Sequence, residues 1–295
     1  MNRYVFILLF FFLVLAGCKP GNNRNKKVIT IKGSDTMVNL TQSWAEAYMK
    51  KYPGIFIQVT GGGSGNGIAA LMNGSTDIAA VSRDLNPKEI ENGAKKGLIF
   101  KEIPVAKDAI AIIVNKNNKI NSLSLSQLGA IFSGKIRNFS LVGGSDLGIS
   151  IYSRENNSGT YEFFKKNVLS GNDFASFSLH LQGTAALAEA VSKDIKGIGY
   201  GGIGYFAKRK DVKIINLIDE ESEFEIQNLV GINGQINYDF IWQGGYSFSR
   251  DLNFVTSGKE SELIQHFLDF VISEEGQRIV FEMEYVPLKK FISAE

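Results

Sequence analysis

Residues 28–59 read VITIKGSDTMVNLTQSWAEAYMKKYPGIFIQV and contain two apolar segments with a helical pattern between them. The first segment, residues 28–31, is rich in β-branched side chains and has the length of a short buried strand. Across residues 37–51 apolar side chains recur at helical spacing, until Pro53-Gly54 interrupts the pattern before a second strand at residues 55–59. A strand, a helix and a strand in this order predict an α/β fold.

The rest of the chain repeats this alternation. Predicted helices occupy residues 68–72, 125–132, 160–168, 184–192 and 260–272. Predicted strands occupy residues 77–81, 109–114, 149–152, 198–200, 212–218 and 252–255. The fold class is therefore α/β, and we expect its sheets to be mostly parallel.

The N-terminal segment has the pattern of a bacterial lipoprotein signal. Residues 1–17 include a basic residue and then an apolar run that is short for a membrane-spanning helix. The run ends in Leu15-Ala16-Gly17-Cys18, which resembles a lipobox, and Cys18 is the only cysteine. We predict that residues 1–17 are a signal peptide, that Cys18 is lipidated, and that residues 18–27 are a flexible tether. The alternatives are an uncleaved anchor and a secretory peptide that happens to contain a cysteine.

Charge and composition exclude several classes of function. Removal of residues 1–17 deletes Arg3, which leaves 31 of the 32 basic residues against 30 acidic ones. A balance this even gives no electrostatic footprint for nucleic acid. A single cysteine allows no intramolecular disulfide, and two histidines without a cysteine cluster do not form a zinc-binding pattern. The remaining chain is long enough for one large domain or two ordinary ones.

Four predicted loops combine small hydroxyl side chains with glycine or an acidic residue. Loops 33–36, 61–67 and 154–160 each precede a helical pattern, and loop 82–84 follows a strand. Helix starts carry unpaired N–H groups and partial positive charge, which attract anions. In α/β proteins such loops gather at the carboxyl ends of strands, where ligands bind. Together with Arg154 in the third of these loops, the pattern predicts a pocket for a tetrahedral oxyanion.

Common nucleotide and nucleophile motifs do not account for the glycine-rich loop 61–67. It lacks the Gly-Lys-Ser/Thr of a Walker A loop and the final glycine of Gly-x-Gly-x-x-Gly. It also misses Gly-x-Ser-x-Gly by one residue, which leaves a nucleophile elbow unsupported. Neither His180 nor His266 lies near a motif. A hydrolase that uses carboxylates stays open as an alternative, although no carboxylate pair stands out at a meaningful spacing.

Three of these loops resemble the binding loops of the phosphate-binding proteins of bacterial phosphate ABC transporters. The residues that carry this resemblance are Gly33-Ser34-Asp35-Thr36-Met37, Gly63-Ser64-Gly65 and Arg154-x-x-x-Ser158-Gly159-Thr160. The likeness continues in residues 273–277 and 285–288, so it covers essentially the whole mature chain. The arginine motif is the most specific of these elements.

The resemblance implies a two-lobed periplasmic-binding-protein fold of type II. In such a fold two α/β lobes are joined by two crossing segments and close over a ligand in the cleft between them. By this analogy residues 28–107 and 247–295 form one lobe and residues 108–246 form the other. The hinges would then lie near residues 105–109 and 246–254.

The resemblance also implies which residues of the first lobe bind phosphate. Thr36 would donate its hydroxyl and Met37 its backbone N–H, while Ser64 would add a hydroxyl and an N–H from the glycine loop. The fourth loop would contribute Ser82 and Arg83. For Thr36 the local alternative is that its side chain merely caps a helix.

In the second lobe the resemblance implies an arginine and a helix start. Arg154 would bind two phosphate oxygens through its planar guanidinium. Ser158, Gly159 and Thr160 would supply hydroxyl and amide donors. The local alternatives are that Ser158 caps a helix and that Arg154 pairs with a surface carboxylate.

The fourth loop departs from the pattern of many relatives. They place an aspartate after the serine, where it accepts the proton of hydrogenphosphate and repels unprotonated sulfate. This chain reads Ser82-Arg83-Asp84 instead, and Arg83 would then donate to the anion, as in a subgroup of the family. Asp35 and Asp84 are the two candidate acceptors for the proton.

Together with the lipoprotein signal, the resemblance implies a non-catalytic solute-binding protein. It would be lipid-anchored to a membrane in the cell envelope, facing the periplasm or the cell exterior, and would act as a monomer without a cofactor. It would bind inorganic phosphate with high affinity and deliver it to the permease subunits of an ABC transporter. The alternatives are another oxyanion, such as sulfate or molybdate, and a phosphate-ester hydrolase on the same scaffold.

Overall fold

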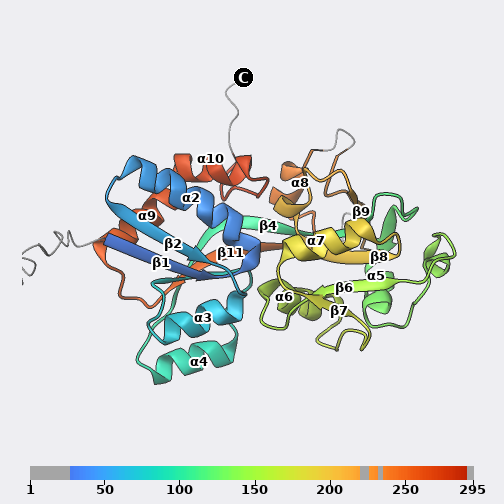
Figure 1. Ribbon diagram of the computed structural model, residues 1–295, viewed down its shortest axis with the longest axis horizontal. Coiled ribbons are helices and arrows are strands. Elements are labelled where there is room, and N and C mark those ends of the chain that lie inside the picture. Colours follow the sequence, from blue (N-terminus) through green and yellow to red (C-terminus); the bar gives the residue numbers. More distant parts are fainter. Residues whose placement is uncertain (1–26, 220–225, 232–234, 291–295) are drawn as a thin grey trace, which may run out of the picture.

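The computed structural model describes residues 27–219, 226–231 and 235–290, which form two lobes side by side (Figure 1). The predicted signal peptide, Cys18 and nearly all of the predicted tether lie outside the described residues. No helix within the described ranges is both long enough and apolar enough to cross a membrane.

Lobe 1 combines the N-terminal part of the described chain with its C-terminal helices. Its strands are β1 (Lys27–Gly33), β2 (Ile55–Thr60) and β3 (Ile78–Val81), and β1 pairs in parallel with both others. Its helices are the short η1 (Asp35–Met37), α2 (Val38–Lys51), α3 (Ser64–Met72), α4 (Pro87–Lys95), α9 (Glu262–Ile272) and α10 (Glu274–Glu282). Helices α2, α9 and α10 pack together on one side of the sheet, while α3 and α4 lie on the other (Figure 1).

Lobe 2 is formed by the middle of the chain. Its strands are β5 (Ser122–Ser124), β6 (Ser150–Arg154), β7 (Leu179–Leu181), β8 (Gly197–Gly202), β9 (Val212–Ile218) and β10 (Ile226–Gln227). Its helices are α5 (Leu125–Phe132), η2 (Phe139–Val142), α6 (Gly159–Val168), α7 (Thr184–Lys193), η3 (Ile203–Tyr205) and α8 (Tyr238–Trp242).

Two long antiparallel strands, β4 (Lys101–Asn115) and β11 (Ser249–Thr256), pass between the lobes. Along β4, Val105 and Ala106 pack in the hydrophobic core of lobe 1, whereas Ala109 and Ile110 pack in that of lobe 2. The strand predicted at residues 109–114 is therefore only the second half of a strand that serves both lobes. The two lobes are thus joined by two chain crossings that pair with each other.

The expectation of mostly parallel sheets is wrong. The strands run in the order β2-β1-β3-β11-β4-β8-β6-β7, and β11 is antiparallel to both β3 and β4. Strand β4 is likewise antiparallel to β8 and β9. The reason is the path of the chain, because β4 carries it into lobe 2 and β11 carries it back, so the two must run in opposite directions. Parallel pairing survives within each lobe, as in β1 with β2 and β6 with β8.

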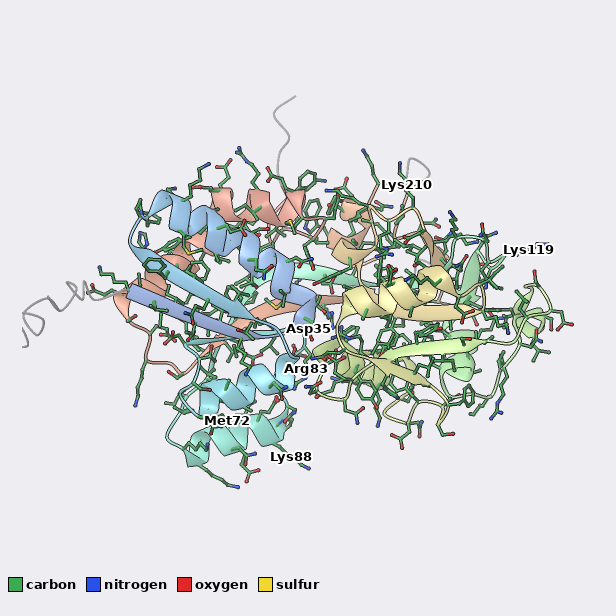
Figure 2. All side chains as sticks on the ribbon, viewed as in Figure 1. Asp35, Met72, Arg83, Lys88, Lys119 and Lys210 are labelled. Atoms are coloured by element: carbon green, nitrogen blue, oxygen red, sulfur yellow. The ribbon has the colours of Figure 1, made fainter. Side chains whose placement is uncertain are left out.

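The carboxyl ends of three strands meet at the boundary between the lobes. Strand β1 ends at Gly33 and leads into η1, β3 ends at Val81, and β6 ends at Arg154 shortly before α6 begins. Figure 2 shows Asp35 and Arg83, which follow β1 and β3, at this boundary. The topology thus brings loops distant in sequence to one place.

Candidate functional site

Three serine hydroxyls of lobe 1 form the base of the site. Ser34 Oγ donates to Ser82 Oγ over 2.9 Å, and the Ser82 N–H donates to Ser64 Oγ over 3.2 Å. The Ser64 and Ser82 hydroxyl oxygens lie 3.4 Å apart, and all three side chains are buried. These serines come from the loops after β1, β2 and β3, so each strand end contributes one hydroxyl.

The first residues of helix α6 of lobe 2, Gly159 and Thr160, contact hydroxyl residues of lobe 1. Thr160 Oγ1 lies 2.8 Å from Thr36 Oγ1 of lobe 1. A Cβ atom added at Gly159 would stand only 2.4 Å from Ser64 Oγ and 2.7 Å from Ser82 Oγ, so only glycine fits at this position. We call Ser34, Thr36, Ser64, Ser82 and Thr160 the hydroxyl cluster.

Two other predicted donors have local partners in this arrangement. Ser158 is the N-cap of α6, and its Oγ accepts a hydrogen bond from the Tyr161 N–H over 3.4 Å. The Met37 N–H donates to the Ser34 carbonyl over 3.0 Å, within the turn that opens η1. Both residues are buried beside the hydroxyl cluster, and the structure shows the capping role that was the local alternative for Ser158.

Arg154 lies at the end of β6 with its guanidinium buried between the lobes. Its Nη2 lies 3.1 Å from Asp35 Oδ2 of lobe 1 and 3.0 Å from Glu155 Oε1, and its Nη1 donates to Thr184 Oγ1 over 2.7 Å. Burial raises the pKa of Asp35, and the neighbouring Glu155 adds to the increase, although the Gly62 N–H and Arg154 act against it. A carboxylate so poised next to an arginine can accept a proton from a ligand.

The structure does not bring Arg83 into the hydroxyl cluster. Its Nη2 lies 2.8 Å from Glu89 Oε1, and its Nε lies 2.7 Å from Glu162 Oε2, which belongs to α6 of lobe 2. Two carboxylates therefore lie around the Arg83 guanidinium, although its Nε makes no hydrogen bond of good geometry within the described residues. Asp84, the second candidate proton acceptor, has an exposed side chain.

An arginine that sequence reasoning missed takes part in the site. Arg250 of β11 donates through Nη2 to Thr160 Oγ1 and to Asp108 Oδ2, each over 2.9 Å. Asp108 stands opposite it on β4, and both side chains are buried. The available signal was a single arginine among polar residues at the start of a strand, Phe248-Ser249-Arg250-Asp251-Leu252. Nothing in that segment links it to loops ninety or more residues away.

The site is rich in hydrogen-bond donors. Hydroxyls and guanidinium groups complement the oxygens of an anion. Among the described residues, no group of three His, Cys, Asp or Glu side chains is arranged to hold a metal ion. His180 lies nearby, but its Nδ1 is 2.9 Å from the backbone carbonyl of Arg154 rather than from a hydroxyl of the cluster.

Comparisons with known proteins give the family. The sequence model of the PBP superfamily domain matches residues 20–275. The phosphate-binding protein PstS of Pseudomonas aeruginosa is 33% identical over 275 residues, which cover 87% of this chain and 81% of that protein. The chain belongs to the PstS family. The PstS of Borreliella burgdorferi is 30% identical over 294 residues, covering 96% of this chain and 98% of the relative.

Solved structures of two phosphate-transport proteins align with most of this chain. A putative phosphate ABC transporter substrate-binding protein from Clostridium perfringens, solved with bound phosphate, aligns with a TM-score of 0.77 and 29% identity. The alignment covers 89% of this chain and all of that one. An ABC-type phosphate transport receptor from Vibrio cholerae aligns with a TM-score of 0.68 and 28% identity, over 88% of this chain and all of the receptor. The two-lobed mixed α/β fold expected from the resemblance is confirmed.

Proposed function

We propose that this protein binds inorganic phosphate between its lobes and delivers it to the permease of an ABC transporter. The hydroxyl cluster is the main support for the proposal. Its members come from both lobes, and the buried guanidinium of Arg250 contacts one of them. Thr36 and Thr160 face each other across the boundary at 2.8 Å. One tetrahedral anion held between them has contacts with both lobes and therefore favours their closed arrangement.

The donors proposed for phosphate are those that the cluster unites. Thr36, Ser64, Ser82 and Thr160 supply hydroxyls, while Arg154 supplies a charged planar fork. Met37, Ser158 and Gly159 stand beside them and are proposed to contribute N–H groups once the anion replaces their present partners. Arg83 is proposed to act differently, as an ion pair between the lobes, because Glu89 and Glu162 lie around its guanidinium.

Isothermal titration of the mature, phosphate-stripped protein tests the proposal. We expect one phosphate per chain, with weaker binding of sulfate and molybdate. Phosphate at about a thousand times its dissociation constant should also stabilise the fold by about 4 kcal/mol in thermal melts. A generic phosphomonoester should not be turned over, since we propose a binding protein and no enzyme. A melt that does not respond to millimolar phosphate contradicts the proposed function.

We further propose that the mature protein is a lipid-anchored monomer of the cell envelope, with Cys18 as the attachment site. This proposal is supported by the Leu15-Ala16-Gly17-Cys18 sequence and by the absence of any other cysteine from the chain. Replacement of Cys18 by serine should release the protein from membranes or leave the signal peptide uncleaved. A Cys18→Ser variant that fractionates and migrates like the wild type contradicts the anchor.

A further inference from the structure

Arg250 lies where the two crossing strands pair, directly opposite Asp108 in the register of β11 and β4. Both side chains are buried, and Arg250 Nη2 lies 2.9 Å from Asp108 Oδ2. A charge removed from water this completely must be paired and hydrogen-bonded. Asp108 provides the pairing charge. The remaining contacts of Nη2 and the surroundings of Nη1 are not explained by this pair.

The Nη2 group of Arg250 also contacts the two threonines that join the lobes. It lies 2.9 Å from Thr160 Oγ1 and 3.5 Å from Thr36 Oγ1. From lobe 2, Phe163 covers the guanidinium, with its ring centre 5.3 Å from Arg250 Cζ. The guanidinium therefore lies against the hydroxyl cluster, between residues contributed by the two lobes.

The Nη1 group of Arg250 is buried and has no hydrogen-bond partner within the described part of the chain. Buried donors are nearly always satisfied, and leaving one free on a charged group is especially unfavourable. A purely structural ion pair accounts for the contact with Asp108. It does not account for the contacts to both threonines or for the free Nη1.

We propose that Arg250 is a second guanidinium ligand of the bound oxyanion, acting beside Arg154. This inference rests on the proposed function and extends it to a residue outside the predicted binding loops. The Nη1 group donates to an anion oxygen, while Asp108 fixes the plane of the guanidinium and offsets one positive charge.

Titration of phosphate into four stripped mature proteins tests this assignment: wild type, Arg250→Gln, Asp108→Asn and the double variant. Arg250→Gln should bind phosphate about 10- to 150-fold more weakly than the wild type, because it lacks a charge-assisted donor. Asp108→Asn removes the carboxylate that fixes the guanidinium plane but leaves the cation in place, so it should weaken binding less than Arg250→Gln does. The double variant should be as weak as Arg250→Gln. A double variant that regains wild-type affinity contradicts the proposal, because the arginine would then only neutralise Asp108.

A spectroscopic readout complements the titrations. In spectra of ¹⁵N-arginine-labelled protein, the guanidinium resonance that is missing from Arg250→Lys is assigned to Arg250. In the wild type this resonance should shift when phosphate is added. A resonance that does not shift contradicts the assignment. Arg137→Gln, which alters an exposed arginine of lobe 2, should bind phosphate like the wild type. If the wild type itself binds no phosphate, the proposed function fails together with this inference. If the wild type binds and Arg250→Gln binds equally well, the inference alone fails.

Discussion

Arg83 and Arg250 are both buried at the boundary between the lobes, yet their surroundings differ. Arg83 lies 2.8 Å from the carboxylate of Glu89 and 2.7 Å from that of Glu162. Arg250 has the one carboxylate of Asp108, the hydroxyls of two threonines and an unpaired Nη1. Arg83 therefore lies among carboxylates and outside the hydroxyl cluster, whereas the unpartnered Nη1 of Arg250 belongs to a guanidinium that contacts the cluster. We therefore expect Arg250 to contact the ligand, although Arg83 is the arginine next to a binding motif in sequence.

The surroundings of Arg83 and the hydroxyl cluster also differ in how they connect the two lobes. Arg83 bridges Glu89 of lobe 1 and Glu162 of lobe 2, and we call these three residues the rim. In the hydroxyl cluster, the uncharged hydroxyls of Thr36 and Thr160 contact each other, and the Arg250 guanidinium contacts Thr160. The Arg154 guanidinium pairs with Asp35, the residue before Thr36. We expect the cluster to determine affinity and the rim to adjust it.

The largest effect is expected in the cluster, from Arg154→Ala. It removes a charged fork from a buried site and should weaken phosphate binding by about 2–4 kcal/mol. Arg154→Lys should recover only part of this loss, because a point charge replaces two directed donors. Titration of both variants measures the effect, with Arg137→Ala as the exposed control. An unchanged dissociation constant for Arg154→Ala would place the site elsewhere.

Gly159→Ala should be the next most damaging change. Its new methyl group would stand 2.4 Å from Ser64 Oγ and 2.7 Å from Ser82 Oγ, so α6 must move away from lobe 1. We expect phosphate affinity to fall by about 1–3 kcal/mol, the usual range for overpacking. Gly148→Ala is a matched control, because its methyl group would meet only the Arg137 carbonyl at 3.9 Å. Equal affinities of the two variants would argue against contact between α6 and the serines in the bound state.

Asp35→Asn should change the choice of anion. The Asp35 carboxylate is half-buried next to Arg154, and its raised pKa, caused first by burial, favours its accepting a proton from hydrogenphosphate. Sulfate offers no proton and meets like-charge repulsion. The ratio of phosphate to sulfate affinity should therefore fall roughly tenfold in Asp35→Asn. Asp84→Asn, at an exposed position, should leave this ratio unchanged, and the reverse result would identify Asp84 as the acceptor.

The smallest effect is expected at the rim, from Glu162→Gln. This change removes the lobe 2 carboxylate from Arg83 and leaves the pair with Glu89 intact. Because Glu162 is partly exposed, phosphate affinity should fall only about two- to fivefold, chiefly through faster release. Stopped-flow release measurements can resolve this change, with Glu91→Gln as the control that breaks an exposed pair within α4. A loss as large as that of Arg154→Ala would show that the rim itself binds the anion.

Much of the fold follows from local pattern. The helix predicted at residues 125–132 and the strand at residues 212–218 have those same bounds in the structure. Helices α4 and α10 were not predicted, although Asn86-Pro87 at the start of α4 and Ser273 before α10 are helix-start signals. The direction of β4 and β11 was also missed, since strand pairing is set by tertiary path rather than by composition.

The hydroxyl residues of the site could be predicted because each belongs to a loop with a recognisable motif. Contacts between residues distant in sequence could not be predicted. The hydroxyl residues Thr36, Ser64, Ser82 and Thr160 were all selected from their loops, and the structure brings them together. Arg83 was assigned to the anion because it follows Ser82, but its partner Glu162 lies on another lobe and could not be seen in sequence.

A crystal structure of the mature protein grown with phosphate tests the central claim most directly. We predict a single anion whose oxygens accept hydrogen bonds from Thr36 of lobe 1, Thr160 of lobe 2 and the guanidinium of Arg154. An anion held by one lobe alone, or bound at Arg83 on the rim, would contradict the account.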